Sequence, residues 1–120
     1  MADRSAIKDW LEGYIRAWNS NAKEDIGRLF SDEAQYFTGP FQEPWRGREG
    51  IIEGWLERKD EPGTFEFKYE ILAVENQTGV VRGLTHYSTD PARTYSNIWL
   101  IRLNDRGECT EFTEWWMKKK

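Results

Sequence analysis

The sequence predicts an α+β fold, in which helices cover one face of a curved antiparallel sheet. In the first half of the chain, apolar residues recur at spacings of three and four, as they do on amphipathic helices. In the second half they alternate with polar residues, and short turn sequences separate the alternating runs, as in hairpins. A length of 120 residues suits one domain, so we expect a single domain over 1–120.

Three helices are expected before the run of hairpins. Ser5 is a candidate N-cap for the first helix, which ends in the polar segment 19–21. Asn21, with an acidic residue three positions later, starts a second, short helix. The third runs from 48 to about 60 and stops at a Pro-Gly pair. The apolar stripe of the first helix consists of Ile7, Trp10, Leu11, Tyr14, Ile15 and Trp18.

Turn sequences divide the rest of the chain into strands. The loop 38–47 holds two prolines and two glycines and separates a short first strand from the third helix. The segments 76–79 and 104–107 are turns that close hairpins, and a proline-containing loop covers 88–93. The expected strands are 34–37, 65–74, 80–87, 94–103 and 109–117.

Composition excludes several classes of partner. The net charge of −4 argues against a general nucleic-acid binder, which normally carries a basic patch, and we interpret the lysines at 118–120 as a solvated end. The single cysteine, Cys109, excludes an intrachain disulfide and suits a reducing compartment. The start of the chain is not a hydrophobic signal, and no apolar run approaches the ~20 residues that span a bilayer. We therefore expect a cytoplasmic protein with no nucleic-acid or membrane partner.

No motif for a metal or a cofactor is present in the sequence. His86 is the only histidine, alternates away from the expected pocket face and has no cysteine or acidic cluster nearby. Cys109 has no histidine partner on its strand, so we interpret it as an inert, half-buried thiol. The chain also lacks a phosphate-binding glycine loop, a dinucleotide fingerprint and a nucleophile elbow. We expect neither a metal nor a cofactor.

The last strand places a carboxylate on an aromatic face. Side chains two apart on a strand point the same way, so Glu114 shares a face with Phe112 and Trp116. A carboxylate there is costly unless it is paired, protonated or used in chemistry. Applied to the other elements, the same periodicity predicts an aromatic cavity with a few polar groups, typical of a site for a small apolar molecule. The expected wall residues are Trp18, Trp55, Tyr69, Tyr87, Trp99, Phe112 and Trp116.

Glu114, Tyr14 and Asn97 are the candidate catalytic residues of this cavity. Burial raises the pKa of a carboxyl toward the range where proton transfer is efficient, so Glu114 is the candidate general acid or base. Tyr14 or Asn97 could donate a hydrogen bond to a developing oxyanion. Simpler interpretations stay open, in which Glu114 pairs with Arg46 or Arg48 or lies in water at the open edge. Likewise, Tyr14 could be a core-edge aromatic, and Asn97 could bond a neighbouring loop.

The opposite face of the sheet is also apolar. With all helices on one side, these residues would be exposed in a monomer, and such a patch usually marks an interface. We therefore predict a twofold homodimer that packs sheet to sheet. The outer-face residues are Leu84, Ile98, Leu100, Trp115 and Met117.

Several segments of the chain are similar to a known family: 14–19 (YIRAWN), 29–34 (LFSDEA), 45–51 (WRGREGI), 95–103 (YSNIWLIRL) and 112–116 (FTEWW). In this order they resemble the nuclear transport factor 2-like superfamily, and within it the SnoaL-like, polyketide cyclase-like branch of small bacterial proteins. The resemblance covers nearly the whole chain. It implies a cone-shaped, cystatin-like fold with a pocket between three helices and the concave sheet, often dimeric through the outer sheet face.

The resemblance implies little about activity, because members include ketosteroid isomerases, polyketide cyclases, epoxide hydrolases, dehydratases and domains with no known reaction. Tyr14 matches the hydrogen-bond-donating tyrosine of the ketosteroid isomerases. Their general-base and protonated-acid positions fall near Thr38 and Trp99, so we expect no activity of that type. The Asp-Arg-Asp set of the epoxide hydrolases is not visible. Polyketide cyclases of this fold place an acidic residue near the end of the last strand, in the neighbourhood of Glu114.

The function expected from the sequence is therefore the binding of a small apolar molecule by a domain of unassigned activity. Cofactor-free acid/base isomerisation, dehydration or cyclisation is the candidate chemistry. The alternative is a non-catalytic dimerisation or protein-binding module.

Overall fold

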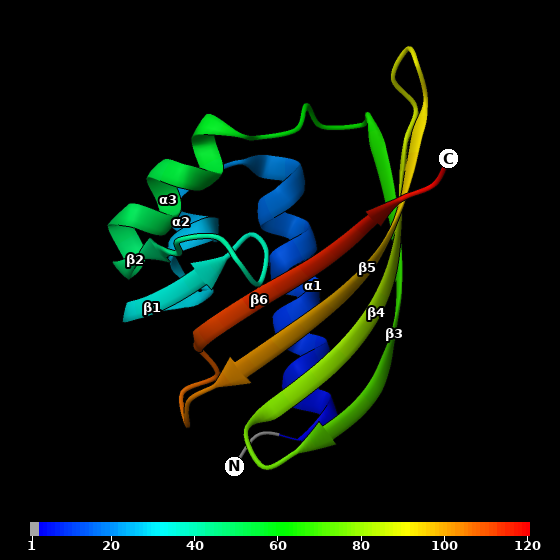
Figure 1. Ribbon diagram of the computed structural model, residues 1–120. Coiled ribbons are helices and arrows are strands. Elements are labelled where there is room, and N and C mark those ends of the chain that lie inside the picture. Colours follow the sequence, from blue (N-terminus) through cyan, green and yellow to red (C-terminus); the bar gives the residue numbers. More distant parts are fainter. Residues whose placement is uncertain (1–2) are drawn as a thin grey trace.

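The helices lie against one side of a single sheet in the computed structural model, which describes residues 3–120 (Figure 1). Met1 and Ala2, part of the start that we expected to carry no signal, lie outside the described residues. Within 3–120, no helix is both long and apolar enough to cross a membrane. The helices are α1 (Arg4–Ser20), α2 (Lys23–Gly27) and α3 (Gly47–Glu57). The strands are β1 (Phe30–Phe37), β2 (Trp45–Arg46), β3 (Phe65–Glu75), β4 (Thr78–Tyr87), β5 (Arg93–Leu103) and β6 (Cys109–Lys118).

Asp3, rather than the expected Ser5, caps the start of α1. The extended backbone of Asp3 (φ −128°, ψ −175°) lets its carboxylate accept a hydrogen bond from the amide of Ala6 at 2.9 Å. Ser5 therefore lies inside the first turn. The helix ends where Asn21 adopts the left-handed conformation (φ 53°) and its amide donates to the carbonyl of Ala17.

The short helix α2 begins without a side-chain cap, so the expected cap at Asn21 is wrong. The backbone of Asn21 ends α1 instead, and its side chain is used elsewhere. Its Nδ2 donates to the carbonyl oxygen of Asp60 at 3.0 Å, and its Oδ1 accepts from Nε1 of Trp55 at 3.2 Å. Asn21 thus ties the end of α1 to α3 and to the segment that follows α3.

Six strands form one mixed sheet in the order β2-β1-β6-β5-β4-β3. Strands β3 to β6 make the expected antiparallel meander, in which Trp99 of β5 lies opposite Glu114 of β6. The expectation of a wholly antiparallel sheet is wrong at one pair, because β1 runs parallel to β6, with Tyr36 opposite Phe112. Parallel neighbours need a long crossover, and here α3 and the other strands of the meander supply it.

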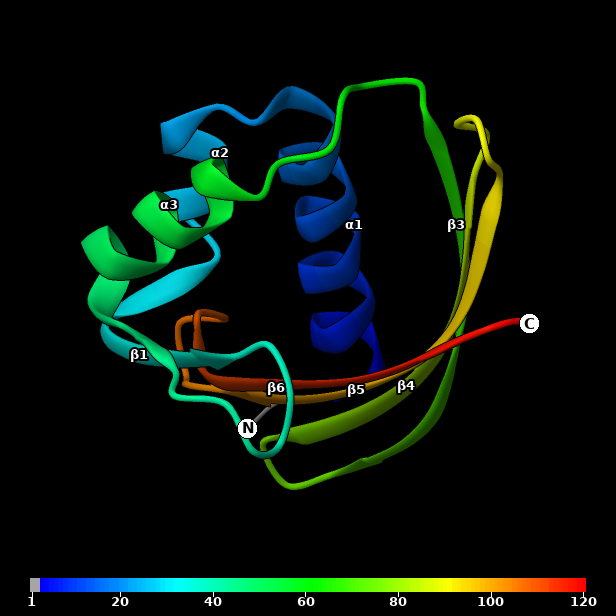
Figure 2. The same cartoon turned by 45° about the horizontal axis from the view of Figure 1, so that its top comes forward.

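The sheet curves around α1, which crosses its concave face (Figure 2). Nε1 of Trp10 donates to the carbonyl of Leu29 at 2.8 Å, so this indole is buried with its polar atom satisfied. Gly79 allows the close approach of α1, because a Cβ there would lie 2.6 Å from Cδ1 of Ile7. The buried residues of α1 are Ile7, Trp10, Leu11, Tyr14 and Ala17, and those of the strands include Phe30, Val81, Trp99, Ile101, Leu103 and Phe112.

Arg48 joins α3 to three other parts of the fold. Its Nε donates to the carbonyls of Gly27 (3.0 Å) and Phe30 (3.1 Å), which end α2 and begin β1. Its Nη1 meets Asp32 at 2.5 Å, and its Nη2 meets Glu108, beside the β5–β6 turn, at 3.3 Å. Because a single half-buried guanidinium satisfies several groups at once, its removal leaves backbone carbonyls without a donor.

We expect Arg48→Ala to lower the free energy of unfolding by about 2–4 kcal/mol, since charge-assisted hydrogen bonds to partly buried groups are lost together. Arg46→Ala is the matched control, because Arg46 pairs only with the exposed Glu43 among the described residues and should cost less than about 1 kcal/mol. Urea denaturation of both variants checks this. Equal losses would show that Arg48 acts only as a surface ion pair.

Candidate functional site

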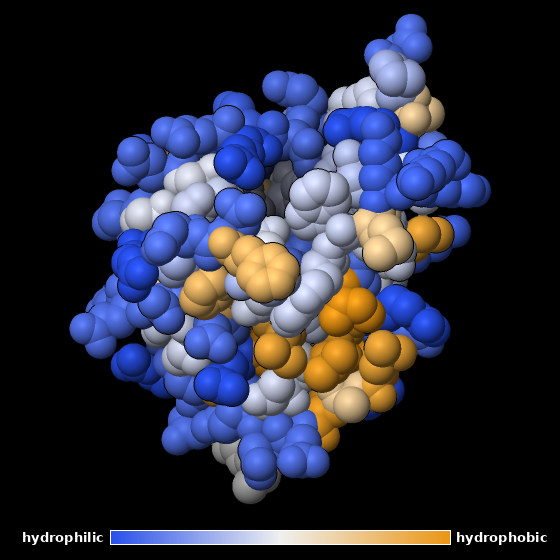
Figure 3. Space-filling view, in the orientation of Figure 1, coloured by the Kyte–Doolittle hydropathy of each residue, from blue (hydrophilic) through white to orange (hydrophobic). Residues whose placement is uncertain are grey.

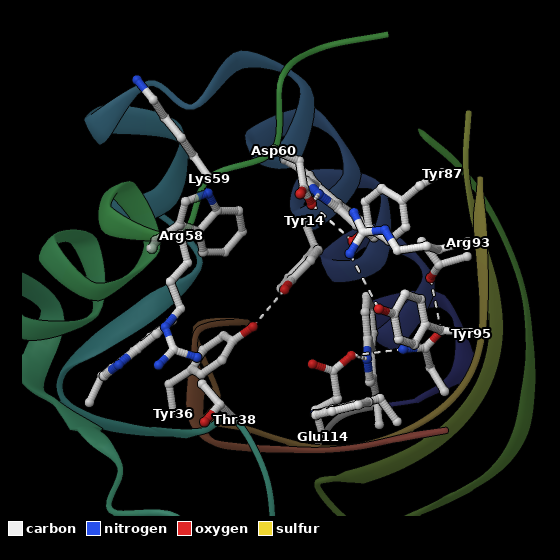
Figure 4. A pocket seen from close by; sticks show the side chains of 17 residues that line it. Tyr14, Tyr36, Thr38, Arg58, Lys59, Asp60, Tyr87, Arg93, Tyr95 and Glu114 are labelled. Carbon is white, nitrogen blue, oxygen red and sulfur yellow. Dashed lines mark hydrogen bonds between the residues drawn. The ribbon is translucent and has the colours of Figure 1, made fainter. Parts of the chain in front are cut away.

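A cavity of about 300 Å³ opens between α1, the end of α3 and the concave face of the sheet (Figure 4). Nine of its 17 lining residues are aromatic, and the other eight carry polar or charged side chains. It is lined by Tyr14, Trp18, Tyr36, Thr38, Trp45, Trp55, Arg58, Lys59, Asp60, Thr85, Tyr87, Arg93, Tyr95, Asn97, Trp99, Glu114 and Trp116. The wall is therefore more polar than the sequence predicted, while its aromatic rings still offer the apolar surface of a small-molecule site.

Glu114 projects from β6 into this cavity with one carboxylate oxygen held and the other free. Its Oε2 accepts hydrogen bonds from Nδ2 of Asn97 at 2.9 Å and from Nε1 of Trp99 at 2.8 Å. No residue in the described part of the chain bonds its Oε1. Burial raises the pKa of Glu114, and the charge of Asp60 adds to this, while the two hydrogen bonds oppose it. The carboxyl is therefore both oriented and easier to protonate than an exposed one.

A buried polar chain fixes the amide that orients Glu114. Oγ1 of Thr85 donates to Oδ1 of Asn97 at 2.8 Å, and both side chains are almost fully buried. This bond sets which end of the Asn97 amide carries the N–H groups that face Glu114. Asn97 is thus a fixed donor to the carboxyl, and its role as an oxyanion donor stays a prediction.

Tyr14 of α1 and Tyr36 of β1 form a pair of hydroxyls on the wall that faces Glu114 (Figure 4). The two oxygens are 2.7 Å apart, and either can be the donor. One hydroxyl hydrogen is used between them, so the other is left to donate into the cavity. Burial raises the pKa of both tyrosines, and the nearby Glu114 raises them further. Both therefore stay protonated as donors at neutral pH.

Asp60 is the second carboxylate of the cavity. Its Oδ2 accepts from Nε1 of Trp18 at 2.9 Å and from the hydroxyl of Tyr87 at 3.0 Å. Burial raises the pKa of Tyr87, and Asp60 contributes to that shift. Asp60 thus joins the segment after α3 to α1 and to the end of β4, and closes one side of the cavity.

The structure brings together the three candidate catalytic residues and five of the seven expected wall residues. The two exceptions are Tyr69 and Phe112. The hydroxyl of Tyr69 donates to Glu12 at 3.1 Å, because α1 packs against β3 and separates this ring from the cavity. Phe112 is fully buried, and its ring stacks on that of Tyr14 and on that of Tyr36. Those that line the cavity are Glu114, Tyr14, Asn97, Trp18, Trp55, Tyr87, Trp99 and Trp116.

Sequence reasoning missed Tyr36, Asp60 and Arg93. Tyr36 and Ala34 are two residues apart and share the buried face of β1. The alternation of the short expected strand could therefore have indicated that Tyr36 points inward. Arg93 has the same strand parity as Tyr95 and would have been found by extending β5 by one residue. Asp60 lies in an irregular segment, where no periodicity indicates the direction of a side chain.

The simpler interpretations of Glu114 do not describe its surroundings. Arg46 pairs with Glu43, and Arg48 pairs with Asp32 and Glu108, so neither meets Glu114. Nor does the carboxyl lie in open water, because it is largely buried in the cavity wall.

The remaining reactive side chains lie outside the cavity. His86 is exposed, and its Nδ1 lies 2.8 Å from Oγ1 of Thr94. Cys109 is fully buried, rather than half-buried as expected, and burial raises the pKa of its thiol to about 12. Over residues 3–120, no three side chains among His, Cys, Asp and Glu form a group that could hold a metal ion. The absence of a cofactor stays a prediction.

Comparison with known proteins agrees with this architecture. The chain belongs to the SnoaL-like domain family, which it matches over residues 11–112. No curated protein matches it significantly. The family therefore defines the class of protein and leaves its activity unassigned.

Several solved structures share the fold at low sequence identity. A proposed ketosteroid isomerase from Kribbella flavida has a TM-score of 0.74 and 16% identity, over 97% of this chain and 81% of that one. An NTF-2 like protein of unknown function from Burkholderia xenovorans has a TM-score of 0.73 and 15% identity, over 97% and 86%. SalBIII, an epoxide hydrolase/cyclase-like enzyme in pyran ring formation in salinomycin, has a TM-score of 0.76 and 13% identity, over 98% and 95%. At these identities the likeness shows the nuclear transport factor 2-like fold alone.

We expect Glu114→Gln to change how stability depends on pH. Because the pKa of Glu114 is raised in the folded state from its ordinary 4.5, the folded protein binds more protons than the unfolded chain above that value. Wild-type stability should therefore fall as pH rises from the unfolded to the folded pKa of this carboxyl, by about 1.4 kcal/mol for each pH unit between the two. Glu114→Gln removes this loss, because an amide does not titrate.

Urea denaturation between about pH 4 and pH 8 measures this difference. Glu111→Gln, on the same strand, corrects for the change in net charge. A variant that loses stability relative to wild type as pH rises would mean that the hydrogen bonds favour the carboxylate over the acid.

Proposed function

We propose that the cavity is a cofactor-free acid/base site in which Glu114 transfers a proton on a small, mostly apolar molecule. The arrangement of Glu114 carries this proposal, since one oxygen is held by Asn97 and Trp99 and the other is left for a substrate. A raised carboxyl pKa suits proton transfer near neutral pH. Isomerisation, dehydration and cyclisation all use such a step.

The two sides of the cavity have complementary roles in this proposal. The ionised Glu114 takes a proton from a carbon beside a carbonyl, and the electron pair of that C–H bond moves toward the carbonyl oxygen. The Tyr14–Tyr36 pair donates its unused O–H to that oxygen as negative charge develops. Glu114 then returns the proton to a different atom of the same molecule, which completes an isomerisation. For dehydration, the departing oxygen takes the proton instead.

The aromatic wall supplies the surroundings that this chemistry needs. Trp99 stacks on Phe67 and also packs against Tyr14, with ring centroids 4.7 and 4.6 Å apart, so the floor beneath a ligand is rigid. Trp18 and Trp55 add apolar surface from the helices. Excluding water strengthens the hydrogen bonds to a developing charge.

Base-catalysed ring opening of nitrobenzisoxazole tests the proposal without knowledge of the natural substrate. A base removes the proton on the ring carbon, the N–O bond breaks, and the oxygen leaves as a phenolate that the tyrosine pair can stabilise. We expect wild-type protein to catalyse this reaction and Glu114→Gln to lose about a hundredfold or more of the rate.

Glu111→Gln is the matched control and should keep the wild-type rate, because Glu111 does not line the cavity. Tyr14→Phe should slow the reaction by about tenfold or more, since a donor to the phenolate is lost. Equal rates for wild type and Glu114→Gln would refute the acid/base role and favour a non-catalytic binding module.

A second proposal concerns the outer face of the sheet. Hydrophobic side chains gather over strands β4 to β6 on this face (Figure 3). Leu84 is 50% exposed, Trp115 41% and Met117 75%, whereas Ile98 and Leu100, also expected to be exposed in a monomer, are half-buried. We propose that a second copy of the chain covers this patch in a twofold homodimer.

The single cysteine suits the reducing cytoplasm, where we place the protein.

We expect sedimentation to show a dimer of wild-type protein at micromolar concentration and a monomer of Trp115→Arg. The charge would be buried without a partner in the interface, which is costly. Phe41→Ser is the control, because Phe41 is 97% exposed but lies in the loop before β2. A wild-type monomer, or a dimer that Trp115→Arg leaves intact, would contradict this interface.

A further inference from the structure

Arg93 is a half-buried cation on the cavity wall that meets no carboxylate in the described part of the chain. Its guanidinium lies over the ring of Tyr87, 4.5 Å from the centroid. Its Nη1 donates to the hydroxyl of Tyr95 at 3.3 Å. A guanidinium has five N–H donors, and this one uses a single side-chain hydrogen bond in residues 3–120. The stacking holds its plane in place and leaves a pair of donors for another group.

The charges around the cavity favour an anion. Arg58, Lys59 and Arg93 line it, and none of them forms an ion pair in the part of the chain that the structure describes. The two carboxylates do not balance them. Asp60 and Glu114 carry two negative charges when both are ionised, against the three positive charges, so the lining keeps one excess positive charge. An incoming monoanion would therefore meet a positive surface.

We propose that the ligand of this cavity carries a carboxylate, which Arg93 binds through two parallel hydrogen bonds while the apolar body lies against Trp99 and Trp18. The proposal rests on the proposed function, because it names the substrate class of the same site. A carboxylate matches the planar fork of a guanidinium. A phosphate dianion fits less well, because a second charge would lie close to Asp60, which shares Tyr87 with Arg93.

This contact also sets the orientation of the ligand. Trp99 lies opposite Glu114 in the sheet, whereas Arg93 is the first residue of the same strand. Figure 4 shows Arg93 beside Tyr87 and Tyr95, across the cavity from Tyr36. A molecule with its carboxylate on Arg93 extends its other end toward Glu114 and the tyrosine pair. Arg93 is thus a binding residue that directs the reacting carbon to the proton-transfer group.

Calorimetric titration with naphthoate and its neutral isostere naphthamide tests the proposal. We expect wild-type protein to bind naphthoate about tenfold more tightly than naphthamide. Arg93→Gln should remove this preference by weakening naphthoate alone. Arg93→Lys, which keeps the charge but lacks the planar fork, should keep only part of it. Arg102→Gln is the matched control, because it removes the same charge from β5 without lining the cavity and should leave the preference intact.

Several results would overturn the proposal: no preference for naphthoate in wild type, no binding of either compound, or an equal loss in Arg102→Gln. A preference that Arg93→Gln retains would mean that Arg93 serves only to hold Tyr87. The benzisoxazole reaction separates this inference from the proposed function. If Glu114→Gln loses the rate but wild-type protein shows no preference for naphthoate, only the proposed carboxylate binding by Arg93 is refuted. A preference together with an unchanged rate in Glu114→Gln refutes the acid/base role alone.

Discussion

The packing of Tyr14 between α1 and the concave sheet is the contact on which both the core and the cavity depend. Its ring lies 4.6 Å from that of Trp99 and 4.9 Å from that of Trp55, so it joins the floor of the cavity to a helix of its roof. Its hydroxyl meets Tyr36 at 2.7 Å. The ring packs in the core and Tyr14 also lines the cavity, so the core-edge and hydrogen-bond-donor interpretations of Tyr14 are compatible. This is the usual use of a tyrosine, whose apolar body and polar tip can serve different surroundings.

A largely buried carboxyl carries an energetic cost when it is ionised. Glu114 has no cationic partner in the described part of the chain, and its hydrogen bonds come from neutral groups, Asn97 and Trp99. Neutral donors orient the group and reduce the cost of its charge, whereas an arginine would have held it permanently ionised. Glu114 can therefore change its protonation state more readily than a carboxylate that is held by an arginine, such as those paired with Arg48.

The fold of this chain does not identify its activity, whereas the side chains of the cavity restrict the chemistry that it can perform. Proteins that share no more than 16% identity with this chain have the same fold, and their names span an isomerase, a cyclase-like enzyme and a protein of unknown function. Function must therefore follow from the side chains that line the cavity. In this chain those are a held carboxyl, a tyrosine pair and an arginine without a carboxylate partner.

Local periodicity made much of this predictable from sequence. The stripe of α1 and the alternation along β6 were enough to expect a helix over a curved sheet, with Glu114 and Trp99 turned toward it, because helices and strands repeat over a few residues. What depended on distant pairing came only from the tertiary structure. The parallel β1–β6 pair placed Tyr36 against Tyr14, and the packing of α1 on β3 removed Tyr69 from the cavity. Asp60 lies in an irregular segment, where no periodicity indicates the direction of a side chain. Its place in the cavity wall follows from the tertiary packing of that segment against α1 and β4.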